Sequence, residues 1–210
     1  ASWPARYANH AAFDSPIVTT IVNLLHADHW RAAGHAPRLA LGHSIGEVAA
    51  AHVAGLLSVD GALVTARTLG LAGCKCAGAM VHARLARDEV DAWSDALLRV
   101  AAVNGVASSG ADALLLSVTL CGPKERAEEW LAARPDAKKL APPHPWHHPM
   151  YLDVQGVRDG SAFASLPEGP SPGPTAAIFL SATRAGAPVE RIDATYWREW
   201  LTTRVDFKSA

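Results

Sequence analysis

One stretch, LALGHSIGE from Leu39 to Glu47, constrains the fold more than any other part of the chain. The apolar residues at its start predict a short buried strand, and an alanine-rich helix is expected directly after it, from Glu47 to Leu57. Between strand and helix, two glycines flank a serine in the pattern G-x-S-x-G, with the serine at Ser44. Strand, tight turn and helix form the arrangement of a nucleophile elbow, which holds a serine in a strained backbone conformation with its hydroxyl exposed.

The elbow predicts a role for the residues around the serine. Because neighbouring chain must pass close to Ser44, we expect Gly42 and Gly46 to be required for steric reasons. The N–H of Ile45, at the start of the helix, is then placed to donate to an oxyanion on a bound substrate. G-x-S-x-G also occurs in ordinary turns, and it is the flanking strand and helix that favour a catalytic serine here.

The bulk composition excludes several classes of protein. The 210 residues suit one large domain or a domain with an insert, and half of them are apolar. A formal charge of −1 gives no basic surface for nucleic acid. The three cysteines lack the spacing of a disulfide framework, and the sequence has no signal peptide and no apolar run of membrane length. These features predict a cytoplasmic protein with reduced thiols. His26 and His29 could pair on a metal, but a polar helix face explains them better, so we predict no metal site.

The middle of the chain predicts an insert. Strand and helix patterns alternate there as β-α-β-β-α-β, the order of a ferredoxin-like unit. We therefore predict an α/β fold in which residues 1–78 and 143–210 form an α/β-hydrolase-like core and residues 79–142 form a ferredoxin-like small subdomain. The chain opens without an initiator methionine, which suggests a domain cut from a longer protein. We expect the core to be incomplete at both ends.

A proline-rich loop follows the predicted insert. Residues 141–150 (APPHPWHHPM) break every periodicity, and the prolines leave the loop little conformational freedom. The loop carries His144, His147 and His148, and a rigid loop that presents an imidazole is what a general base needs. A surface loop that happens to contain histidines is the alternative, and the serine elbow favours the catalytic interpretation.

These stretches together resemble the acyltransferase domains of polyketide and fatty acid synthases, the malonyl-CoA:acyl-carrier-protein transacylase family. The elbow with the residues after it (GHSIGEVAAA) is similar to the family's signature around its acyl-accepting serine. The resemblance covers nearly the whole chain. It is carried by residues 42–51, 56–58, 78–80, 103–105, 144–147, 192–197 and 205–207.

The resemblance implies a Ser–His dyad and ping-pong chemistry. Ser44 would be the nucleophile and His147 its general base, with the imidazole oriented by a main-chain group rather than a carboxylate. The serine would take an acyl group from acyl-CoA and pass it to the phosphopantetheine thiol of an acyl carrier protein. No bound cofactor is implied.

The resemblance also assigns the acyl pocket. It implies substrate contacts from His43, Asn104 and Trp146, and an arginine on the second helix after the elbow that binds the carboxylate of malonyl-type substrates. Arg67 is the arginine on that helix, two residues short of the usual spacing from Ser44. An aromatic residue at Trp146 favours malonyl, because a ring there crowds an α-methyl branch.

Two features depart from the family. Residues 1–15 contain no glutamine loop of the kind that contributes to the oxyanion hole, and the chain stops at Ala210, before segments that family members add. His148 replaces the usual serine beside the base and could compete for the proton.

The expected partners are malonyl-CoA or a related acyl-CoA, an acyl carrier protein, and neighbouring domains of a megasynthase such as a ketosynthase. Arg134, Lys138 and Lys139 are candidates for contacting an acidic carrier. Two other functions stay open. A serine hydrolase or thioesterase shares G-x-S-x-G, but its catalytic residues follow one another along the chain in the order Ser, Asp, His. The absence of the glutamine loop would be consistent with a catalytically weak domain that serves as a scaffold.

Overall fold

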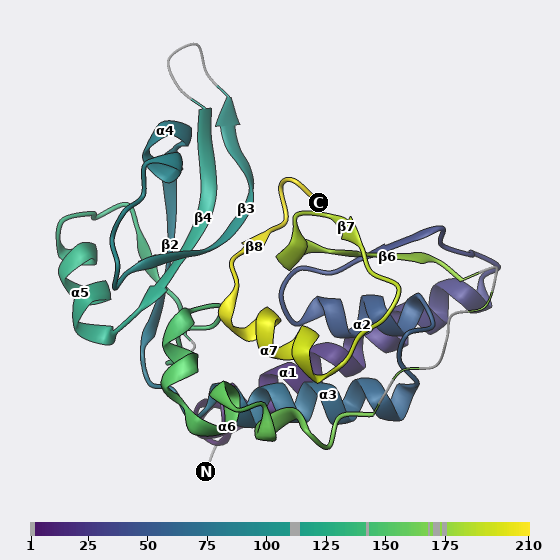
Figure 1. The fold of residues 1–210 in the computed structure, drawn as a ribbon. Coiled ribbons are helices and arrows are strands. Elements are labelled where there is room, and N and C mark those ends of the chain that lie inside the picture. Colours follow the sequence, from purple (N-terminus) through teal and green to yellow (C-terminus); the bar gives the residue numbers. More distant parts are fainter. Residues whose placement is uncertain (1–2, 110–113, 142, 168, 170–172, 174–175) are drawn as a thin grey trace.

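The structure is a computed structural model that describes residues 3–109, 114–141, 143–167, 169, 173 and 176–210. Two parts lie side by side in Figure 1, with α7 and β8 between them. The first part contains α1 (Trp3–Ala32), β1 (Leu39–Leu41), α2 (Gly46–Val53), α3 (Val59–Gly73), η1 (Pro149–Asp153), α6 (Gln155–Arg158), η2 (Ser161–Phe163), β6 (Ile178–Ser181), η3 (Ala182–Arg184), β7 (Ala187–Pro188), α7 (Ala194–Thr202) and β8 (Val205–Asp206). The second contains β2 (Ala79–Ala86), α4 (Arg87–Asp91), β3 (Arg99–Ser109), β4 (Leu114–Gly122), α5 (Lys124–Ala132) and β5 (Lys138–Lys139).

The second part has the predicted β-α-β-β-α-β order. Its strands lie in the order β5-β2-β4-β3, and each neighbouring pair is antiparallel. The predicted fold class, a large α/β part with a ferredoxin-like insert, is confirmed. The predicted limits of the insert stay a prediction, and residue 142 lies outside the described residues.

The small sheet is completed by a strand from the far end of the chain. β8 pairs in parallel with β3, with Val205 opposite Ala102. The insert is therefore joined to the first part by backbone hydrogen bonds as well as by its two connections.

The strand before the serine is in its predicted place, but it is not buried as predicted. β1 is an edge strand of the sheet β1-β6-β7 and pairs in parallel with β6. Ala40 is buried, whereas Leu39 and Leu41 are exposed. Successive side chains of a strand point to opposite faces, so only the alanine reaches the core.

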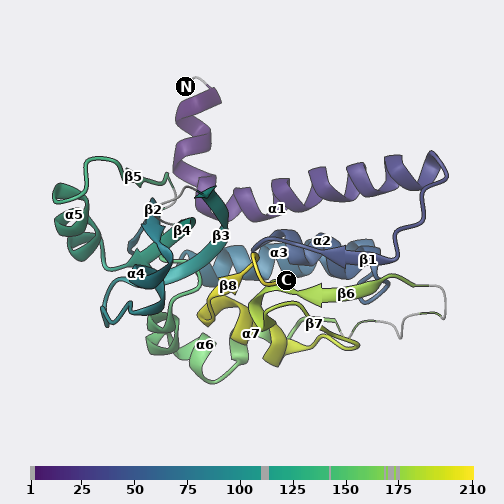
Figure 2. The same ribbon diagram turned by 90° about the horizontal axis from the view of Figure 1, so that it is seen from above.

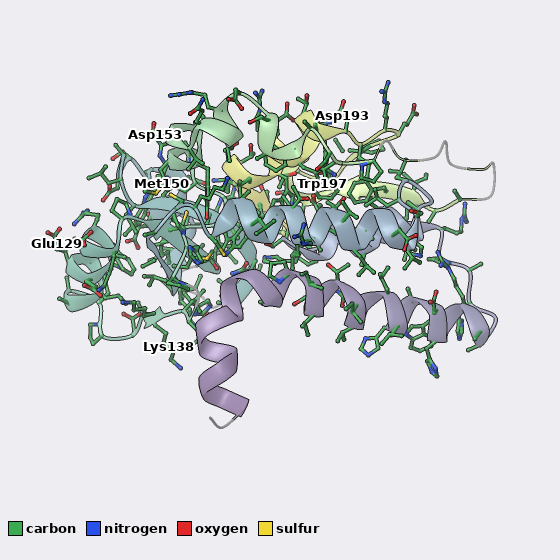
Figure 3. All side chains as sticks on the ribbon, turned by 90° about the horizontal axis from the view of Figure 1, so that it is seen from below. Glu129, Lys138, Met150, Asp153, Asp193 and Trp197 are labelled. Carbon is green, nitrogen blue, oxygen red and sulfur yellow. The ribbon has the colours of Figure 1, made fainter. Side chains whose placement is uncertain are left out.

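α2 packs against β1 and β6 of this sheet, and two further helices lie next to α2. α1 packs against both α2 and α3, and Figures 2 and 3 show it running alongside them. The apolar spacing from Ile17 to Arg31 predicts a helix, and these residues lie within α1, which extends back to Trp3 and contains Pro16. Figure 2 shows α1 bending near its N-terminal end, as an internal proline is expected to cause. None of the helices in the described residues is long and apolar enough to cross a bilayer.

Two predicted helices are shorter or broken in the structure. The sequence pattern predicts one helix from Arg87 to Leu98, but α4 ends at Asp91. Asp95 then accepts hydrogen bonds from the backbone N–H groups of Leu97 and Leu98, which makes a turn. The sequence pattern also predicts a helix over residues 150–164, where the structure has three short pieces, η1, α6 and η2. The Asp95 turn is a side-chain interaction that hydrophobic spacing does not encode.

A buried carboxylate connects the helix after the serine to the C-terminal segments. Glu47 is fully buried, and its oxygens accept hydrogen bonds from the Tyr196 hydroxyl at 2.7 Å and from the backbone N–H groups of Ala182 at 2.6 Å and Thr183 at 3.2 Å. Burial raises the pKa of the Glu47 carboxyl, and these hydrogen bonds oppose that shift. The network fixes α7 against α2.

Replacing this carboxylate should destabilise the fold. Glu47→Ala leaves several buried donors without an acceptor, so we expect a loss of about 2–4 kcal/mol in the free energy of unfolding. Chemical denaturation monitored by circular dichroism measures this change in the free energy of unfolding. Glu199→Ala is the matched control, because it removes the exposed ion pair with Arg184 and should change stability far less. Equal effects of the two substitutions would contradict this account.

Candidate active site

The serine lies in the strained turn that the sequence predicts. Ser44 has a φ of 52°, in the left-handed region that non-glycine residues rarely adopt. A Cβ at Gly42 would lie 2.1 Å from the backbone carbon of Gly46, so only glycine fits there. A Cβ at Gly46 would meet nothing within 4 Å, so the steric reason predicted for the second glycine is wrong.

The turn also leaves a donor for an oxyanion. Ile45 stands at the N-cap of α2, and the N–H groups of the next three residues bond to carbonyls of the turn. Within the described part of the chain, the N–H of Ile45 itself has no backbone acceptor. This donor can therefore face a negative oxygen beside Ser44.

A histidine from the proline-rich loop meets the serine. His147 Nε2 lies 2.8 Å from Ser44 Oγ, although the residues are 103 positions apart in the chain. The other ring nitrogen, Nδ1, lies 2.8 Å from the main-chain carbonyl oxygen of Trp200. A carbonyl can only accept, so Nδ1 carries the proton and Nε2 is left as the acceptor for the serine hydroxyl. This is the tautomer that a general base needs.

The environment of the imidazole keeps it neutral. His147 is almost fully buried, and this burial lowers its pKa to about 4, while the hydrogen bond to the Trp200 carbonyl acts in the opposite direction. At neutral pH the ring is therefore unprotonated and able to accept a proton from Ser44.

Trp200 holds both members of the dyad. Its indole Nε1 donates to the carbonyl oxygen of Ser44 at 3.3 Å, and its ring packs edge-on against His147 with 4.6 Å between ring centroids. The sequence places Trp200 on the inner side of a helix, but nothing in the sequence marks its carbonyl, because every residue has one.

A cavity of about 300 Å³ opens beside the serine. Its walls come from both parts of the fold and are mostly apolar. They include Ile45, Met80, Leu140, Trp146 and Trp200, with His43 and Thr119 as polar members. In the described residues no three His, Cys, Asp or Glu side chains come close enough to hold a metal ion.

The predicted substrate-binding residues divide into three groups. His43 and Trp146 line the cavity. Asn104 lies behind the cavity lining, where its Oδ1 is 2.8 Å from His43 Nε2 and its Nδ2 donates to Thr119. Arg67 is exposed on α3 and is not part of the lining, so the structure does not bring it to the site. The family spacing falls instead on the fully buried Leu69.

His148 does not compete for the proton. Its Nδ1 accepts from the backbone N–H of Met150, and its Nε2 lies 3.0 Å from the carbonyl oxygen of Leu97. Both ring nitrogens are thus occupied, and the side chain fastens the histidine loop to the small subdomain.

Comparison with known proteins identifies the family. Residues 15–210 match the family described as "Acyl transferase domain". The chain is 34% identical over 180 residues to the mycoketide-CoA synthase of Mycobacterium tuberculosis, covering 83% of this chain and 4% of the synthase. It is 32% identical over 208 residues to erythronolide synthase EryA2 of Saccharopolyspora erythraea, covering 93% of this chain and 5% of that protein.

Comparison with solved structures gives the same family. The acyltransferase domain from the second module of the salinomycin polyketide synthase has a TM-score of 0.76 and 28% identity, covering 94% of this chain and 46% of that one. The chain thus spans less than half of that structure and a few per cent of the synthases. It belongs to the acyl transferase domain family found in polyketide synthases.

The lowered pKa of His147 predicts an unusual pH profile. Since only the neutral imidazole accepts a proton, acylation of Ser44 should be level from neutral pH down to about pH 5 and should fall only as pH approaches 4. Quench-flow acylation at limiting acyl-CoA measures it, with circular dichroism to verify folding at each pH. A fall centred near the ordinary histidine value of 6.5 would contradict the prediction.

Trp200→Phe tests the contact with the serine. The change keeps the main-chain carbonyl that orients His147 but removes the indole N–H, which should slow acylation about fivefold, equivalent to ~1 kcal/mol. Trp197→Phe, the same change on the same helix, is the control and should leave the rate within about twofold. Equal rates for both variants would show that the indole contact does not matter.

Proposed function

We propose that this domain transfers an acyl group from coenzyme A to the phosphopantetheine thiol of an acyl carrier protein, through an ester on Ser44. The observation that carries the proposal is the 2.8 Å contact between Ser44 Oγ and a His147 ring whose Nδ1 is bonded to a carbonyl. Membership of the acyl transferase domain family supports the same chemistry.

The first half-reaction follows from this geometry. His147 Nε2 takes the hydroxyl proton as Ser44 Oγ attacks the thioester carbon, and the N–H of Ile45 donates to the oxygen that becomes negative. The carbon–sulfur bond then breaks, and the imidazolium returns its proton to the leaving coenzyme A thiolate. The main-chain carbonyl of Trp200 stabilises the imidazolium meanwhile, as a carboxylate does in a triad.

The second half-reaction reverses these steps. The carrier thiol loses its proton to His147, its sulfur attacks the ester carbon, and Ser44 regains the proton as the leaving group. The imidazole bonds to a carbonyl here instead of a carboxylate, which favours this interpretation over a hydrolase with the order Ser, Asp, His.

A second cavity offers a route for the long thioester arm. It has a volume of about 690 Å³ and includes His147 in its lining, so it reaches the dyad from the cleft between the two parts of the fold. Arg99 and Arg204 also line it. These guanidinium groups would suit the phosphate of a phosphopantetheine arm.

The carrier protein and the synthase context are part of the proposal. Arg134 and Lys139 form ion pairs with Glu89 and Glu128, at 2.6 and 2.7 Å. Lys138, which Figure 3 shows at the edge of the small subdomain, is exposed and has no ion pair among those of the described residues. A carrier with an acidic surface could contact it. We place the reaction in the cytoplasm, next to domains such as a ketosynthase, as the relatives' synthase context suggests.

Intact-protein mass spectrometry tests the proposal. After incubation with a panel of acyl-CoA thioesters the chain should gain one acyl group, and added phosphopantetheinylated carrier protein should remove it and become acylated. Ser44→Ala should abolish the adduct, and Ser108→Ala, which alters an exposed strand serine, should not.

Three results would contradict the proposal. An adduct that persists in Ser44→Ala would place the nucleophile elsewhere. Release of free acid without acylated carrier would favour the hydrolase. No adduct from any thioester would favour the scaffold.

A further inference from the structure

We propose that the cavity beside Ser44 accepts a short neutral acyl group and disfavours acyl groups that carry a free carboxylate, malonyl included. The inference rests on the proposed acyl transfer and adds its substrate class. The malonyl preference expected from Trp146 concerned the crowding of an α-methyl branch, whereas charge is a separate requirement.

The cavity wall offers a carboxylate no fixed positive charge. Among the described residues that line it, the polar groups are Ser15, His43, Ser44 and Thr119, and the rest are apolar. A carboxylate moved from water into such a cavity loses its hydration and needs a cation or several donors in exchange. A methyl or methylene group in the same place gains from the transfer instead.

Two polar groups of the wall, His43 and Thr119, are bonded to Asn104 behind it. Asn104 Nδ2 donates to the Thr119 hydroxyl, so its Oδ1 is the acceptor for His43 Nε2. In the neutral His43 ring the proton is then on Nε2, and Nδ1 is a hydrogen-bond acceptor. An acceptor cannot pair with a carboxylate.

The helix behind the cavity cannot supply an arginine. Arg67 is exposed and Leu69 is fully buried in the large core. Residues two apart on a helix lie about 200° apart, so these two face opposite sides of α3. One turn after Leu69, a Cβ at Gly73 would lie 2.2 Å from the Trp146 ring. The indole therefore lies directly on the backbone of α3 and separates that helix from the cavity.

The substrate class fixes what the product can do. A carrier-bound acyl group without an α-carboxylate cannot lose carbon dioxide to form a carbanion. In carbon–carbon bond formation such a thioester serves as the electrophile that accepts a carbanion. The reaction that consumes the product would therefore be a condensation in which this group is the primer.

A competition experiment tests the inference. The chain is mixed with equimolar acetyl-, propionyl-, malonyl- and methylmalonyl-CoA, and each adduct on Ser44 is followed by intact-protein mass spectrometry. We expect acetyl or propionyl adducts to form at least about tenfold faster than malonyl adducts. Malonyl adducts that form as fast or faster would overturn the inference and leave acyl transfer intact, whereas no adduct at all would overturn both.

A variant supplies the missing charge. Leu140 lines the cavity and is only half-buried, so Leu140→Arg places a cation there at modest risk to the fold. It should raise the malonyl rate relative to the acetyl rate about fivefold or more over that of Leu140→Gln, the uncharged control of similar polarity. Equal ratios in the two variants would show that charge does not set the preference.

Discussion

The hydrogen bond between one main-chain carbonyl and one imidazole determines how this site works. The carbonyl of Trp200 fixes the proton on Nδ1 of His147, and this alone leaves Nε2 free to accept from Ser44. A carbonyl has no charge that could be neutralised by acid, so the group that bonds directly to Nδ1 does not itself titrate. The base therefore depends on the position of a helix rather than on the ionisation of a partner.

The position of that helix depends in turn on the buried polar network behind the serine. Tyr196, four residues before Trp200 on α7, donates to Glu47, which lies in the first turn of the helix that follows the elbow. The same segment that presents the nucleophile thus anchors the segment that orients the base. Hydrogen bonds to a buried charged group are strong, and their loss leaves unpaired groups on both sides. The positions of the nucleophile and the base are consequently coupled through this network.

Local patterns predicted the serine and the histidine that the structure brings together, and long-range packing limited the rest of the prediction. The elbow around Ser44 and the rigid loop around His147 are visible because turns and prolines constrain their own neighbours. The carbonyl of Trp200 and the open space at Gly46 depend on segments far away in the sequence, and no local pattern encodes them. Arg67 shows the same limit. Its spacing from Ser44 is two residues shorter than the spacing usual in the family, and a shift of two residues moves a side chain to the opposite face of a helix.

The distance along the chain between the parts of the dyad has a consequence for its assembly during synthesis. Nucleophile and base are 103 residues apart, and the carbonyl that fixes the base comes 53 residues later still. A ribosome-bound nascent chain can therefore make the serine turn and strands β2, β3 and β4 of the small sheet before Trp200, which orients the imidazole, has been added. On this geometry Ser44 would become reactive only after α7 has left the exit tunnel and docked against the serine turn.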